Sequence, residues 1–362
     1  MAAKKKHKNK KNWLTSLSFG SIALVLTVLL VLSYLSVAVP PEKAWFFTLF
    51  GLLYPVVLPA TLVLFIIALV RRSRTRLVLA VALLPSLFIA GRYIQLSAPK
   101  DASQPTLSVV SYNVGLFAHG REGIGRLALA DSVARYVNGL DADIICFQEF
   151  YLPPDVSIDA WLGRHFPGYK ADYYMRTEKN WRSGNVILTR NGASAKGKVV
   201  FEKSSNMALW ADVQLDAATK LRIYNCHFES YNISLPALVQ RKSAVEETER
   251  KLRHSITERP RQVAKVMAGI DQAPVHSIVV GDFNDTPLSY TYFRLLRGRK
   301  DSFMRAGKGF GATYSALWPL LRLDYILYPG ELRATSHRIE KVKFSDHYPV
   351  IAQFYESGRD SK

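Results

Sequence analysis

The sequence predicts an α+β sandwich, in which two packed sheets are flanked by helices, preceded by three transmembrane helices. Two observations carry this prediction. Residues 1–97 contain three long, almost uncharged apolar stretches. The rest of the chain alternates short apolar runs with charged helical segments, which is typical of layered sheets and helices. We therefore expect an N-terminal membrane domain at 1–97, a linker at 98–105, a folded domain at 106–356 and a tail at 357–362.

Each apolar stretch is long enough to cross a bilayer, which requires about 20 residues. The expected spans are 13–39, 45–70, which contains two prolines, and 77–96, where Arg92 lies near the end and can reach the interface. A cleaved signal peptide is the competing interpretation of the first span. The two further spans and the lack of a clear small-residue cleavage site favour a membrane-spanning helix.

Basic residues are distributed unevenly around these spans. Six lysines lie within 4–11 and four arginines within 71–76, whereas the 40–44 turn is nearly neutral. The positive-inside rule then places the N-terminus and the 71–76 loop in the cytoplasm. Three spans deliver the rest of the chain to the extracytoplasmic side of the cell (inner) membrane. No obligate protein partner is evident.

The charge of the chain and its cysteines give weaker indications. The net charge is +19, and residues 1–97 hold 12 of the 48 Lys and Arg and one of the 29 acidic residues, so they carry +11 and the remaining 265 residues carry +8. A moderately basic domain suits an anionic substrate without identifying it. Cys146 and Cys226 lie in apolar runs, so buried free thiols are expected, and a bridge requires neighbouring strands.

The most informative stretch is 277–287. Its β-branched run predicts a buried strand that stops at Gly281 and delivers Asp282 and Asn284 on one side, with Phe283 turned into the protein. We expect a helix to begin at Pro287. Alone, the stretch reads equally well as an Asp- and Asn-rich turn.

Further elements follow from periodicity. The expected strands are 107–114, 143–149, 184–190, 207–215, 221–228, 323–328 and 345–352, the expected helices are 123–140, 232–258 and 260–270, and 150–183 is expected to be a loop.

Polar side chains recur in or at the ends of these apolar strands. The set is Asn113, Glu149, His227, Asp282, Asn284, Asp324, Asp346 and His347. Singly, each has an ordinary structural explanation, such as a strand end, a local ion pair or a core histidine. Charged groups are costly to bury without partners, so convergence of the strand ends on one cleft explains the whole set.

Metal-assisted hydrolysis of a phosphate ester suits this set of groups. Glu149 offers the hard oxygen that Mg²⁺ prefers, and Asp282 with Asn284 can orient an attacking water. A histidine whose second nitrogen meets a carboxylate is a tuned acid–base or electrostatic group. No Cys or His cluster has zinc-ligand spacing, and no glycine-rich phosphate loop is present.

Six short motifs in order resemble those of the endonuclease/exonuclease/phosphatase superfamily. They are Ser111-Tyr112-Asn113, Phe147-Gln148-Glu149, Asn225-Cys226-His227, Gly281-Asp282-Phe283-Asn284, Arg322-Leu323-Asp324-Tyr325-Ile326 and Ser345-Asp346-His347-Tyr348-Pro349-Val350. The resemblance covers roughly 106–355 and implies a four-layer, deoxyribonuclease-I-like α/β sandwich with Mg²⁺ or Mn²⁺ at the strand ends.

The resemblance also implies roles for these residues. Glu149 would be the main metal ligand, with Asn113 nearby and Asp346 at the metal side. In the catalytic set, Asp282 would position or activate the water and Asn284 would hold the phosphate. His227 and His347 would contact the scissile phosphate, with His347 oriented by Asp324. Cys226 stands where the family often has Thr, with little expected effect.

The substrate is left open, because family members cut DNA, RNA, phosphoinositides and sphingomyelin or remove other phosphates. Specificity would lie in the loops 150–183, 229–258 and 297–320, with the basic aromatic stretch 173–182, including Arg182, contacting substrate. Tethering favours a lipid or envelope-associated phosphodiester, since the membrane supplies it at high effective concentration. An extracytoplasmic nuclease is the alternative, and a membrane-anchored binding module without turnover is the alternative from another class.

Overall fold

The structure is a computed structural model that describes residues 2–97, 104–120, 123–178, 181–202, 204–215, 219–231 and 242–356. The chain divides into two compact units. The first holds residues 1–91 and the short segment 288–290, and the second holds the remainder. Each unit is described separately below.

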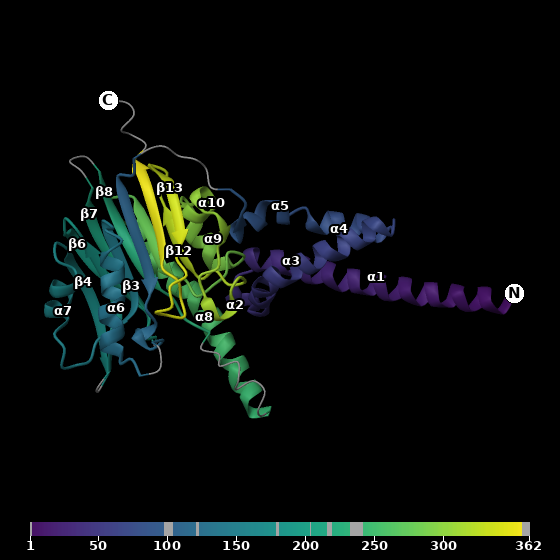
Figure 1. Cartoon of the computed structure of the whole chain (residues 1–362), viewed down its shortest axis with the longest axis horizontal. Coiled ribbons are helices and arrows are strands. Elements are labelled where there is room, and N and C mark those ends of the chain that lie inside the picture. The colour runs from purple at the N-terminus through teal and green to yellow at the C-terminus, as the bar shows by residue number, and fades with distance from the viewer. Residues whose placement is uncertain are drawn as a thin grey trace. The chain divides into compact units, whose positions relative to one another are not determined.

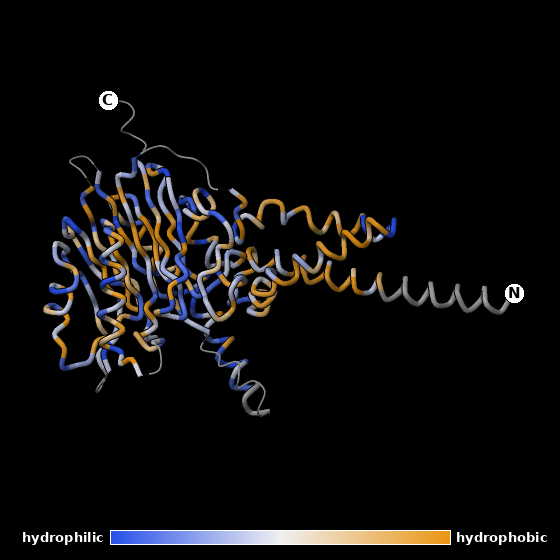
Figure 2. Tube along the Cα trace, viewed as in Figure 1, coloured by the Kyte–Doolittle hydropathy of each residue, from blue (hydrophilic) through white to orange (hydrophobic). Residues whose placement is uncertain are grey.

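The first unit consists of helices. They are α1 (Ala2–Ala38), α2 (Pro41–Ala44), α3 (Phe46–Val70), α4 (Thr75–Leu83) and α5 (Ser86–Ile89). Three segments are long and apolar enough to cross a membrane, Phe19–Ala38, Phe46–Val70 and Thr75–Arg92, and Figure 2 shows them as largely hydrophobic. Pro55 and Pro59 lie inside α3, which continues past both.

The third apolar segment is shorter than the sequence predicts. It ends with a 3-10 turn, η1 (Ala90–Arg92), instead of reaching Leu96. The chain then forms β1 (Ile94–Gln95), which pairs with β11 (Gly309–Phe310) of the second unit. The Arg92 guanidinium lies 4.9 Å from the ring centroid of Phe293. Backbone pairing within the second unit therefore ends the span early.

The second unit contains two six-stranded mixed sheets. The first has the order β10-β12-β9-β8-β7-β6, and the second β13-β14-β2-β3-β5-β4. The strands of the first are β10 (Lys300–Asp301), β12 (Asp324–Tyr328), β9 (Ser277–Asp282), β8 (Lys220–His227), β7 (Met207–Gln214) and β6 (Ala193–Val200). Those of the second are β13 (Leu332–Ile339), β14 (Val350–Glu356), β2 (Leu107–Asn113), β3 (Ile144–Tyr151), β5 (Trp181–Thr189) and β4 (Lys170–Glu178).

Helices cover the outer face of each sheet, which gives four layers (Figure 1). Helices α6 (Arg126–Asn138) and α7 (Ile158–His165) bury Val133 and Trp161 against the second sheet. Helices α8 (Lys242–Asp271) and α9 (Tyr290–Leu296) cover the first sheet, where Val266 packs with Val279. A third core, which includes Val109 and Ile278, lies between the sheets. The predicted four-layer sandwich is confirmed.

The segment 150–183 is not the loop that the sequence predicts. It contains α7, β4 and the start of β5. The side chains of Tyr173 and Met175 pack on the helix-covered core, whereas Tyr174 packs on the core between the sheets. The basic residues among these aromatics hide the alternation that places β4 at the edge of the second sheet.

Several other boundaries differ from expectation. Residues 242–271 form the single helix α8, in which Pro260 is internal because buried residues on both sides of it pack on the protein. The remaining expected helical residues, 232–241, lie outside the described part of the chain. The helix expected at Pro287 begins at Tyr290, and the last strand begins at Val350. The edge strands β6 and β13 were not expected, because their half-exposed sequences give a weak signal.

Candidate active site

The topology brings the polar strand ends together. The parallel pairs β2–β3 and β8–β9 end on the same side, and Asn113, Glu149, His227 and Asp282 lie at or near these ends. Strands β12 and β14 run antiparallel to these and begin there, so Asp324 lies directly opposite Asp282 in the ladder. The loop before β14 carries Asp346 and His347. Register therefore gathers residues that are far apart in the sequence.

Asp282 is buried at the centre of the cluster. The Asn113 amide nitrogen donates to Asp282 Oδ2 at 2.9 Å and to Glu149 Oε1 at 3.0 Å, and so holds the two carboxylates side by side. His227 Nε2 lies 3.5 Å from Glu149 Oε1 and 3.9 Å from Asp282 Oδ2. Burial raises the pKa of Asp282, although His347 and His227 oppose this shift.

His347 and Asp324 form a buried pair. The Nδ1–H of His347 donates to Asp324 Oδ2 at 2.8 Å, and its Nε2 lies 3.7 Å from Asp282 Oδ2. Burial by itself would lower the pKa of His347, but the Asp324 and Asp282 carboxylates outweigh it and hold the pKa well above its usual value. The two carboxylates therefore favour the imidazolium form of the ring, with its charge beside Asp282.

Two site residues have unusual backbone conformations. Glu149 has φ +49° and follows a register shift between β3 and β5, and Asn284 has φ +51°. Positive φ is uncommon for residues other than glycine, and it concentrates at functional sites. In Asn284 this turn lets the backbone N–H donate to Asp282 Oδ1 at 2.8 Å while the amide donates to Phe228 O at 2.9 Å.

Asp346 lies beside a histidine of the segment that follows β2. Its Oδ2 is 3.6 Å from His119 Nε2, and its side chain is 30% exposed. Burial raises the pKa of Tyr314, and Asp346, Asp282 and Glu149 raise it further, so all three carboxylates act on one hydroxyl. The Tyr314 ring also meets that of His347 edge-on, at 5.2 Å.

A cavity of about 300 Å³ opens at this cluster. Glu149 and His227 line it together with Arg176 and Trp181. Arg182 is not among its lining residues, because its guanidinium donates to the carbonyls of Pro153 at 2.9 Å and Val156 at 2.6 Å. Arg176, from the same basic aromatic stretch, lines the cavity and donates to Ser204 O at 2.6 Å.

A buried amide network lies beneath the site, and the sequence did not reveal it. Asn225 from β8 donates to Phe147 O and Val186 O at 2.9 Å each, and its Oδ1 accepts from Gln148 Nε2 at 2.7 Å. Because β8 belongs to one sheet and Phe147 and Val186 to the other, the amide joins the two sheets. Both Asn225 and Gln148 lie within quoted motifs, so their positions were a usable signal.

The two cysteines are free and fully buried. Burial raises the pKa of both thiols. They are therefore inert packing residues, as expected.

The donor set fits a divalent cation. Oxygen and nitrogen atoms of Glu149, His227 and Asp282 lie within 4.8 Å of one another. Glu149 is partly open to the cavity and lies beside Asp282, and a cation would neutralise these two carboxylates. The Asn113 oxygen does not face them, because it accepts from the Gly115 N–H at 3.0 Å. Glu149 is thus better placed as an oxygen ligand than Asn113.

Two family profiles match this chain, one in its N-terminal part and one in the part that contains the candidate active site. The profile of the Endonuclease/Exonuclease/phosphatase family matches residues 110–347, and that of a domain of unknown function matches 16–93. No curated protein matches the sequence.

Solved structures show the same fold at low identity. An endonuclease/exonuclease/phosphatase from Beutenbergia cavernae has a TM-score of 0.51 and 15% identity, and the match covers 70% of this chain and 72% of that one. The human Nocturnin catalytic domain with bound sulfate has a TM-score of 0.51 and 17% identity, covering 70% and 96%. A family protein from Leptotrichia buccalis has 0.50 and 18%, covering 69% and 99%. With the family profile matching well over half of its length, the chain belongs to the endonuclease/exonuclease/phosphatase family.

Proposed function

We propose that this protein is a membrane-tethered, divalent-metal-dependent phosphoesterase. One observation carries the proposal. His227 Nε2 is buried and has no hydrogen-bond partner among the described residues, and it lines the same cavity as the partly exposed Glu149 carboxylate. A free imidazole donor beside an open carboxylate suits a phosphoryl group that is held next to a cation.

Glu149 and Asp346 would hold Mg²⁺ or Mn²⁺. When bound, the ion supplies charge neutralisation and Lewis-acid polarisation of a phosphoryl oxygen. Asn113 keeps Glu149 and Asp282 close through its two amide hydrogen bonds. It therefore acts as a positioning residue for the carboxylates.

Asp282 accepts the proton of the attacking water. Its raised pKa makes it a stronger base than an exposed carboxylate. The Asn284 N–H fixes Asp282 Oδ1, and we assign the Asn284 side chain to holding a phosphate oxygen.

The two histidines stabilise charge on the phosphoryl group. His227 offers its unpartnered nitrogen as a donor. His347, kept as an imidazolium by Asp324, supplies positive charge at the same centre. Arg176, at the cavity wall, is the substrate-binding residue that replaces Arg182 in this proposal.

A lipid or envelope-associated phosphodiester is the proposed substrate, acted on outside the cytoplasm. The positive-inside rule supports this side of the membrane, and tethering raises the effective concentration of substrates in that membrane. The positive charge of the second unit suits anionic head groups.

The proposal is tested with the full chain in detergent, by hydrolysis of bis-p-nitrophenyl phosphate with Mg²⁺ or Mn²⁺. We expect EDTA to abolish turnover. Asp282→Asn and His227→Gln should each lower kcat by roughly 10²–10⁴, whereas Glu149→Ala should raise the metal concentration needed. The matched controls Asp155→Asn and His254→Gln change exposed residues and should retain activity. Metal binding without turnover would instead favour a binding module.

A second experiment tests the substrate class. Full-length protein with Mg²⁺ is offered phospholipid vesicles, plasmid DNA and structured RNA in parallel. Release of head groups or phosphate from the vesicles is expected. Rapid nicking of DNA with untouched vesicles would reject the lipid substrate and favour an extracytoplasmic nuclease. A reporter fused after Lys362 should be active only outside the cytoplasm.

A further inference from the structure

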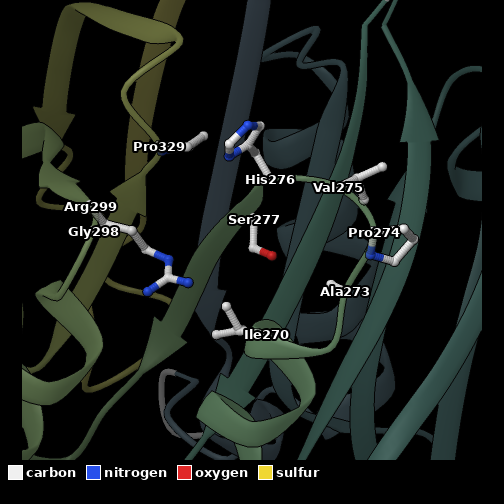
Figure 3. Close-up of a pocket in the computed structure, with 9 residues that line it drawn as sticks. All are labelled: Ile270, Ala273, Pro274, Val275, His276, Ser277, Gly298, Arg299 and Pro329. Atoms are coloured by element: carbon white, nitrogen blue, oxygen red, sulfur yellow. The ribbon is translucent and has the colours of Figure 1, made fainter.

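A second hollow lies at the opposite end of β9 from Asp282. It has a volume of about 240 Å³ and is lined by Ser277, His276 and Arg299 among apolar residues that include Ile270 and Pro329. Figure 3 shows the side chains of Arg299 and Ser277 reaching into the same space from different elements. The candidate active site uses none of these residues.

Arg299 is a half-buried cation that has no carboxylate partner in the described part of the chain. Its Nη1 donates to the carbonyls of Leu295 at 3.0 Å and Arg297 at 3.1 Å, while its Nε is buried and unpaired there. Burial lowers the pKa of Arg299, and Asp271 opposes this shift without forming an ion pair. The guanidinium thus keeps donor capacity and an uncompensated charge.

Ser277 presents a second unused donor. The residue is 4% exposed, and its hydroxyl has no hydrogen-bond partner within the described residues. A buried hydroxyl normally finds a partner, so this one is free to bond a group that enters the hollow. His276 lies at the rim, where its Nε2 pairs with Glu331 Oε1 at 3.2 Å.

We propose that this hollow binds a small oxyanion, with inorganic phosphate as the simplest example. The polar groups that line it are an arginine, a serine hydroxyl and an imidazole, and no carboxylate is among them. A tetrahedral oxyanion accepts several hydrogen bonds and neutralises the guanidinium. Glu331 lies beyond the rim and pairs with His276, which leaves Arg299 and Ser277 as the principal donors. This inference does not depend on the proposed phosphoesterase activity.

The test is thermal unfolding of the full chain in detergent with EDTA and increasing inorganic phosphate, at constant ionic strength. Ligand binding to the folded state raises the unfolding temperature in a saturable way. Phosphate also stabilises proteins nonspecifically, but that effect grows without saturation and is common to all variants. We expect a saturable rise in the wild type. Arg297→Gln, which removes an exposed arginine two residues away, should behave in the same way.

Arg299→Gln should lose the part of the saturable rise that this hollow contributes, whereas any phosphate binding at the active site, at the other end of β9, is common to all variants. Ser277→Ala provides an independent measurement. It should raise the unfolding temperature without phosphate, because an unpaired buried hydroxyl is removed, and it should weaken the dependence on phosphate. An equal saturable rise in the wild type, Arg299→Gln and Ser277→Ala would overturn the proposal, as would a loss in Arg297→Gln that matches the loss in Arg299→Gln.

Discussion

Replacing Asn225 by alanine tests whether the buried amide network holds the two sheets together. The side chain is fully buried and makes three hydrogen bonds, two of them to the carbonyls of Phe147 and Val186 in the other sheet. In the variant, Gln148 keeps its bonds to Ser111 Oγ and Cys146 O at 3.3 Å. Only the carbonyls of Phe147 and Val186 therefore lose a hydrogen-bond donor. Each buried group left short of a partner costs about 1–3 kcal/mol, so the expected loss is on the order of 3 kcal/mol.

That loss corresponds to a fall in unfolding temperature of roughly 6–12 °C for a domain of this size. The assay is thermal unfolding of the full chain, followed by circular dichroism. Asn191→Ala is the matched control, because that residue is exposed and makes one 3.3 Å bond to Gln214 O. It should change stability by less than about 0.5 kcal/mol. Equal effects of the two substitutions would refute the bridging role of Asn225.

Three further predictions concern buried residues of the second unit. Arg322 donates to both Asp301 oxygens, at 2.6 and 2.8 Å. Asp301→Leu leaves the Arg322 charge buried without its partner and should cost roughly 3–5 kcal/mol in denaturant unfolding, and adding Arg322→Met should restore part of the lost stability. Burial, aided by the charge of Arg322, lowers the pKa of His337 from 6.5 to about 3, so the unfolded chain takes up this proton at a higher pH than the folded chain. The free energy of unfolding should therefore be highest above pH 6.5 and fall as the pH drops towards 3, more steeply in the wild type than in His337→Gln. Gly281 has φ +127°, and a Cβ there would lie 1.9 Å from the Cys226 carbonyl oxygen, so Gly281→Ala should cost on the order of 4 kcal/mol in the same unfolding assay. The control Gly298→Ala, with open space around the new Cβ, should cost only about 1–2 kcal/mol.

Local patterns in the sequence were sufficient for the elements that are uniformly buried or uniformly apolar. The run Ile278–Val280 is β-branched and fully buried in β9, and the first two expected spans contain long apolar helices in the structure. The polar residues at or near the ends of β2, β3, β8 and β9 were identified because a polar side chain at the end of an apolar run stands out against its neighbours. The four-layer sandwich follows from such runs and from the ordered motifs.

The tertiary structure alone decided the details that depend on distant residues. Edge strands such as β6 alternate between half-buried and exposed positions, so their sequences carry little signal. The Asn113 amide faces two carboxylates because Asp282, 169 residues away, arrives beside it. Arg182 is bound to carbonyls of the preceding loop, whereas Arg176 lines the cavity. Strand register and long-range hydrogen bonds fix these orientations, and neither is encoded in any single stretch of sequence.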